Sequence, residues 1–186
     1  KPGNVHRTRD FFDMSFEDFL ISGVVTQNII TSSATQAKEI LKDNDYSKAH
    51  IGKYILEAVK ETDNWIKNNT NLGIMMLEVP IAQAASISND FTEIQENIGK
   101  LLDATTVEDA VNLYDAINLA SAGGMGEQEE YDVQSDNAKD ELRKNNQTMF
   151  ACQINNGMQH FIAIQSTRRI VGINHHNRFS ARRNFG

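Results

Sequence analysis

Apolar positions recur every three or four residues along most of the chain, which is the spacing of α-helices that turn one face to a core. Alternating, strand-like spacing is scarce, and only two prolines interrupt the pattern. The clearest helix spans about residues 50–67, and its apolar stripe consists of Ile51, Tyr54, Ile55, Ala58, Val59, Thr62, Trp65 and Ile66. We therefore predict an all-α fold, a single helical bundle.

Capping residues indicate where other helices begin. Ser15 is a candidate N-cap, and Asp18 three residues later forms an imperfect capping box with it. Thr106 and Asp109 have the same spacing farther along the chain. The run at 72–87 is apolar almost all round, which is typical of a central buried helix. These signals predict a succession of helices through most of the chain.

Weaker patterns complete the expected layout. The helix after Ser15 has an apolar face made of Phe16, Phe19, Leu20, Gly23 and Val24. The other segments with helical spacing are 34–42, 91–102, 107–119 and 136–150. Residues 162–173 have some β-type character.

Charge divides the chain into two parts. The 186 residues carry a net charge of −7 and are 40% apolar, which is enough for one core. Residues 151–186 contain five arginines and no acidic residue, so the whole negative charge lies on residues 1–150. We expect 1–150 to form the helical domain. The basic tail, 151–186, is either a disordered end or a phosphate-binding arm.

Composition excludes several classes of function. An acidic chain is unsuited to general nucleic-acid binding, which needs basic surface. No stretch approaches the roughly 18–20 apolar residues of a membrane span. A single cysteine, Cys152, cannot form an internal disulfide and fits a reducing cytoplasm. We expect a cytoplasmic protein that acts on small molecules, with no nucleic-acid or membrane partner; its apolar stripes leave a homodimer open.

The opening of the chain gathers cations around a turn. Gly3 follows a proline, which is a turn signal, and Lys1, Arg7 and Arg9 can hold phosphates. A helix that begins near Ser15 adds the positive end of its dipole. We interpret this segment as a candidate phosphate-binding loop.

The same segment carries groups suited to proton transfer. His6 titrates near neutrality, and the carboxylates of Asp10 and Asp13 are three residues apart. On a helical turn the two carboxylates would share one face and one Mg²⁺ ion. The alternative is a capped helix surrounded by solvated charges, and from spacing alone the two interpretations are about equal.

A second group precedes the buried helix at 72–87. Asn69, Thr70 and Asn71 offer three hydrogen-bonding side chains, and Gly73 permits close approach of the backbone. One of the three can serve as a helix cap, but a cap explains only one of them. We expect the group to recognise a ribose, a base edge or a phosphate.

A third group is rich in glycine. Gly123, Gly124 and Gly126 exceed what a helix C-cap needs, and such a loop can bring backbone N–H groups to a phosphate. Neither the Walker nor the Rossmann pattern is present. Asp132 follows, and we expect it to bind the metal together with Asp10 and Asp13.

These groups occur together and in order, and they carry a resemblance. The segments KPGNVHRTRDFFDMSFEDFL, NTNLGIMML and DAVNLYDAINLASAGGMGEQEEYDV together resemble the triphosphoribosyl-dephospho-CoA synthase family over roughly residues 1–150. The Lys-Pro-Gly-Asn-Val-His-Arg and Asn-Thr-Asn-Leu-Gly patterns, with HIGKYILEAVKETDNW at 50–65, look most similar to the archaeal-type branch.

The resemblance implies a helical transferase that uses ATP as a ribosyl donor. In the family the 2′-hydroxyl of 3′-dephospho-CoA attacks C1′ of the ATP ribose and adenine leaves; the archaeal-type branch leaves a related coenzyme precursor open as acceptor. Asp10 or Asp13 would stabilise the cation-like ribose or hold Mg²⁺, and His6 or an aspartate would take the hydroxyl proton.

Two other functions are compatible with the residues alone. One is a metal-dependent hydrolase or transferase that acts on another phosphorylated metabolite with the same histidine and aspartates. The other is a non-catalytic helical module that binds a nucleotide or a protein partner. Release of adenine would distinguish the proposed transferase from the hydrolase, which would release phosphate.

Overall fold

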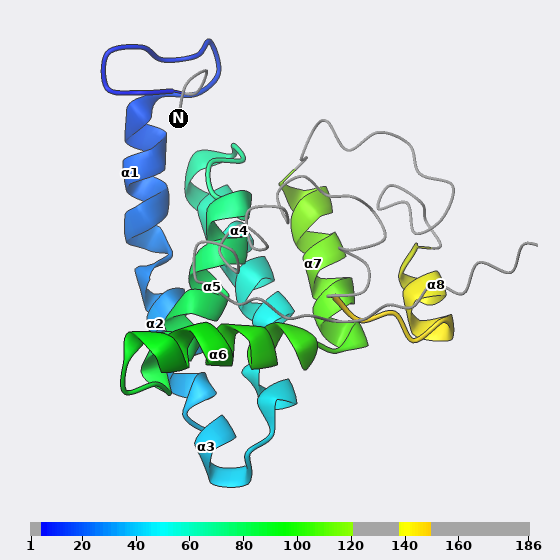
Figure 1. Ribbon diagram of the computed structural model, residues 1–186. Helices are drawn as coiled ribbons and strands as arrows, with labels where there is room; N and C mark the ends of the chain where they lie inside the picture. The colour runs from blue at the N-terminus through cyan, green and yellow to red at the C-terminus, as the bar shows by residue number, and fades with distance from the viewer. Residues whose placement is uncertain (1–4, 121–137, 150–186) are drawn as a thin grey trace, which may run out of the picture.

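A computed structural model describes residues 5–120 and 138–149, which form helices packed on one core (Figure 1). The elements are α1 (Phe16–Val25), α2 (Gln27–Ala37), α3 (Ile40–Asp43), the 3₁₀ helix η1 (Tyr46–Ala49), α4 (Ile51–Ile66), α5 (Leu72–Ser86), α6 (Phe91–Asp103), α7 (Val107–Leu119) and α8 (Ala138–Lys144). Within the described residues no strand forms, and the all-α prediction is confirmed. None of these helices combines the length and the apolar character needed to cross a membrane.

The central helix is α4, which packs against α1, α2, α5 and α7. Its predicted stripe is buried from Ile51 to Thr62, as the spacing requires. Trp65, assigned to the same stripe, is instead 67% exposed, and its indole N–H donates to Glu61 Oε1 at 3.0 Å on the surface of the helix. The prediction is therefore right for most of the helix and wrong for Trp65.

The closest approach between α4 and α7 is at Gly52. A Cβ at this position would overlap the backbone oxygen of Asp109. The Asp109 carboxylate accepts hydrogen bonds from Gly52 N at 2.9 Å and from both Thr106 N and Thr106 Oγ1 at 2.8 Å. The capping box predicted at Thr106 is confirmed, and it also joins α7 to the first turn of α4.

The start of α1 is also as predicted, but its buried face is not. Ser15 and Asp18 form a complete capping box. Leu20 and Val24, expected on the apolar face, are exposed, and Val24 is 71% exposed. The residue of α1 that is buried is Ser22, because its hydroxyl bonds both to the Asp18 carbonyl and across to the turn between α4 and α5.

Several predicted boundaries change in the structure. Helix α5 spans Leu72–Ser86, yet Ile74 and Ile81 are exposed, so its apolar surface is only partly covered. Helix α7 ends at Leu119, before the glycine run. Helix α8 is shorter than expected, because Asn146 soon follows in a left-handed conformation with φ 50°. The basic tail and the β-type pattern at 162–173 lie outside the described residues.

Candidate functional site

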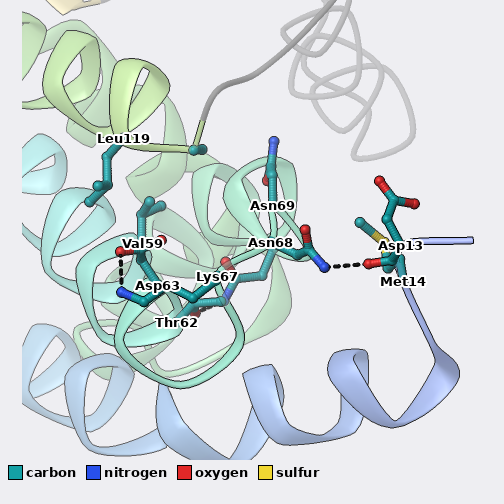
Figure 2. A pocket seen from close by; sticks show the side chains of 11 residues that line it. Asp13, Met14, Val59, Thr62, Asp63, Lys67, Asn68, Asn69 and Leu119 are labelled. Carbon is teal, nitrogen blue, oxygen red and sulfur yellow. Dashed lines mark hydrogen bonds and ion pairs between the residues drawn. The ribbon is translucent and has the colours of Figure 1, made fainter.

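Three segments that are distant in sequence meet at one end of the bundle: the loop before α1, the turn between α4 and α5, and the end of α7 (Figure 1). A cavity of about 310 Å³ opens between them. Its walls, drawn in Figure 2, are formed by Asp13, Met14, Val59, Thr62, Asp63, Lys67, Asn68, Asn69, Asn71, Leu119 and Ala120. Two of the three groups predicted from the sequence therefore contribute residues to this cavity, and the third lies outside the described residues.

The loop before α1 folds back on itself through its own backbone. His6 N donates to Arg9 O at 3.1 Å, and Arg9 N donates to His6 O at 2.8 Å. The backbone N–H of Thr8 donates to His6 Nδ1, so a neutral imidazole carries its proton on Nε2. Arg7 lies over the Phe16 ring with its guanidinium carbon 5.7 Å from the centroid. His6, Arg7 and Arg9 are exposed. They precede the wall residue Asp13 by a few positions, but none of them lines the cavity.

The two aspartates of the loop have different surroundings. Asp10 Oδ1 accepts the first N–H of α1, that of Phe16, at 2.9 Å. Asp13 lines the cavity, and its backbone oxygen accepts a hydrogen bond from Asn68 Nδ2. Residues 10–14 are not helical, so the helical turn on which we based a shared Mg²⁺ ion is absent. In the part of the chain that the structure describes, no group of three acidic, histidine or cysteine side chains suits a metal, and Asp132 lies outside that part.

The turn between α4 and α5 divides the predicted asparagine–threonine group. Asn69 and Asn71 line the cavity. Thr70 is buried away from it, and its hydroxyl bonds to the hydroxyl of Ser22 on α1. Gly73 lies in the first turn of α5 and is not part of the cavity wall. The turn therefore supplies two side chains to the cavity and uses the third to hold α1.

Sequence reasoning missed four polar residues of the cavity wall: Thr62, which was assigned to the apolar stripe, and Asp63, Lys67 and Asn68. Lys67 Nζ and Asp63 Oδ2 form an ion pair at 3.0 Å across one turn of α4. Asn68 continues the asparagine run and was available as a signal. Asp63 and Lys67 fall within the predicted amphipathic helix, and their i, i+4 spacing equally suits a solvated surface pair.

The remaining predicted site residues lie outside the part of the chain that the structure describes; they are Lys1, Gly3, Asp132 and the glycines at 123, 124 and 126. Ala120, which lines the cavity, is the last described residue before the glycine run.

The cavity wall contains both apolar and polar side chains. Val59, Leu119 and Met14 supply apolar surface; Asp63 lies beside Val59, and Asp13 lies beside Met14 (Figure 2). A concave site with apolar walls and a few fixed polar groups is the usual form of a small-molecule site.

Comparison with known protein families gives one result that covers most of the chain. The family model described as ATP:dephospho-CoA triphosphoribosyl transferase (CitG) matches residues 1–159. This range contains every residue that lines the cavity. The comparisons with curated proteins and with solved structures gave no match.

Proposed function

The chain belongs to the ATP:dephospho-CoA triphosphoribosyl transferase family, and on that premise we propose that it transfers the triphosphoribosyl group of ATP to the 2′-hydroxyl of 3′-dephospho-CoA or of a related coenzyme precursor. Adenine is the leaving group. The observation that carries the proposal is the cavity, because the opening loop, the asparagine turn and the helix before the glycine run all reach it.

The reaction exchanges one bond at C1′ for another. The acceptor oxygen attacks C1′ of the ATP ribose, and the bond from C1′ to N9 breaks with its electron pair passing to adenine. The acceptor hydroxyl gives its proton to a base, and adenine gains one. Because positive charge develops on the ribose as the bond breaks, a nearby carboxylate stabilises the transition state.

Asp13 is the residue best placed for that stabilisation, because its side chain is exposed at the cavity wall. Asp10 is less available, since one of its oxygens accepts the Phe16 N–H. Either His6 or one of these carboxylates accepts the acceptor's proton. Asp10 and Asp13 do not share a helical turn, so a Mg²⁺ ion would be held by one of these carboxylates together with Asp132, and it would neutralise phosphate charge.

The phosphates of ATP require cations and backbone donors. Arg7, Arg9 and Lys1 of the opening loop provide the charge, and arginine can bind phosphate through two parallel hydrogen bonds. The glycines at 123, 124 and 126 would add backbone N–H groups. Asn69 and Asn71 would orient the sugar or the base inside the cavity.

The test is the release of adenine. The chain is incubated with ATP, Mg²⁺ and 3′-dephospho-CoA, and liquid chromatography follows free adenine and the mass of the acceptor. We expect adenine and a triphosphoribosyl gain in mass. Adenine without an adduct would retain ATP as donor and exclude this acceptor. Release of inorganic phosphate with no adenine would contradict the proposal and favour a phosphohydrolase.

A further inference from the structure

The amide side chains of the cavity are each oriented by a neighbour. Asn68 Nδ2 donates to the backbone oxygen of Asp13, which can only accept, so among the described residues Asn68 Oδ1 is the free end. Asn69 Oδ1 accepts from Leu72 N at 3.3 Å, which can only donate, so its Nδ2 is the free end. Figure 2 shows this nitrogen at the tip of Asn69, turned away from the helices.

Asn71 is oriented in the same way by Thr62. The Thr62 hydroxyl donates its one proton to Ala58 O at 3.0 Å. It is therefore an acceptor for Asn71 Nδ2, which lies 2.6 Å away. This leaves Asn71 Oδ1 without a partner among the described residues. Both Thr62 and Asn71 are buried, so the arrangement is protected from competing water.

The resulting pattern is rich in acceptors and poor in positive charge. The free amide ends offer two acceptors, from Asn68 and Asn71, and one donor, from Asn69. Among the described residues, the charged groups of the wall are the carboxylates of Asp13 and Asp63 and the ammonium of Lys67, which is paired with Asp63. Such a wall repels a triphosphate, whereas sugar hydroxyls and amino groups find acceptors there.

The size and shape of the cavity also favour a ligand with a sugar and a base over a triphosphate. The volume of about 310 Å³ is near the lower end of the range of roughly 300–1,000 Å³ typical of ligand sites. The apolar sides formed by Val59 and Leu119 suit a flat base. The opening-loop arginines, which suit phosphates, do not line the cavity.

We infer that the cavity binds the nucleoside part of ATP, the ribose and adenine, and that the free amide N–H of Asn69 is its specificity-determining donor. The triphosphate then lies outside the cavity, on the side of the opening loop. The inference builds on the proposed function, which supplies ATP as the ligand. It adds which part of ATP the cavity takes and which hydrogen bond selects it.

The test compares Asn69→Ser and Asn69→Asp with the unaltered chain. Both new side chains can still accept the Leu72 N–H, so the start of α5 is retained, but neither offers an amide donor. Serine keeps the site neutral, and its hydroxyl lies on a shorter side chain that does not reach the position of the Asn69 amide N–H, which separates loss of that donor from added charge. Asn28→Asp, an exposed change on α2, controls for charge alone. Calorimetry measures Kd for adenosine, ATP and inorganic tripolyphosphate, and thermal unfolding checks the fold.

We expect Asn69→Ser to raise Kd for adenosine and for ATP by a similar factor, about tenfold, and Asn69→Asp to raise both further. Kd for tripolyphosphate should be unchanged in Asn69→Ser. Unchanged adenosine binding in both variants would overturn the inference. So would tripolyphosphate binding that weakens as much as adenosine binding, or an unaltered chain that binds tripolyphosphate but no adenosine.

The outcome is separable from that of the proposed function. Adenosine binding that depends on Asn69, in a chain that releases no adenine with any acceptor tried, would support the inference and contradict the reaction. Adenine release that is unchanged in both Asn69 variants would support the reaction and contradict the inference.

Discussion

The two ends of α4 use polar groups in opposite ways. At its first turn, the Gly52 N–H meets Asp109, whose carboxylate is 3% exposed and accepts three hydrogen bonds from the protein. At its last turns, Thr62 and Asp63 face the cavity together with the asparagines that follow (Figure 2). There each asparagine amide has one end bound by the protein, and its other end has no partner among the described residues.

The difference separates a structural contact from a binding site. A buried polar group whose partners are all within the protein contributes to stability and to a unique fold. A polar side chain that the protein holds by one atom is already oriented, so it loses less conformational freedom when a ligand binds its other polar atom. The same residue types therefore have different roles because their hydrogen-bonding capacity is used to different extents.

The largest expected effect is on catalysis, from Asp13→Asn. Removing the cavity carboxylate should lower the rate of adenine release by about 10²–10⁴-fold, as expected for a group that acts on the transition state. Thermal stability should change little, because the side chain is exposed. Single-turnover release of adenine measures the rate. Glu96→Gln, an exposed change on α6, is the control; an equal loss in both variants would contradict the role of Asp13.

The next effect is on stability, from Gly52→Ala. The added methyl group would overlap the backbone of Asp109 and push α7 away from α4. We expect the free energy of unfolding to fall by about 1–3 kcal/mol, measured by urea denaturation. Gly23→Ala is the matched control, because a Cβ there meets nothing within 4 Å. Because alanine is favoured over glycine inside a helix, Gly23→Ala should raise the free energy of unfolding by roughly 0.5–1 kcal/mol. Equal losses in the two variants would contradict the importance of the close contact between Gly52 and Asp109.

A smaller effect is expected from Thr70→Val, which distinguishes this residue from its asparagine neighbours. The change removes the hydroxyl that bonds to Ser22 of α1. Stability should fall by about 1 kcal/mol, and Kd for adenosine should change less than about twofold, because Thr70 does not line the cavity. A large loss of adenosine binding at unchanged stability would show that Thr70 takes part in ligand binding and would contradict its purely structural role.

The smallest effect is expected from Lys67→Met. The side chain of Lys67 is 70% exposed, so its ion pair with Asp63 is screened by water. We expect the free energy of unfolding to change by less than about 0.5 kcal/mol in thermal or urea unfolding. If the free energy of unfolding fell by more than about 1 kcal/mol, the polar contacts at the cavity end of α4 would be stabilising, like those of Asp109 at its other end.

Local features of this fold were determined by the sequence alone. The capping boxes at Ser15 and Thr106 form as predicted, because each needs only residues three positions apart. The burial of α4 from Ile51 to Thr62 follows from the helical period. Family membership likewise rests on short ordered motifs that can be recognised without a structure.

The contacts between elements were decided only by the tertiary structure. Periodicity predicted an apolar face for α1, yet Ser22 is the buried residue because Thr70 lies across from it. It likewise could not show that Gly52 lies against Asp109, or that Asp63 joins the cavity. A helical pattern states which residues share a face, but the packing of other helices decides what that face meets. The cavity therefore became visible only when the opening loop, the asparagine turn and the end of α7 were brought to one end of the bundle.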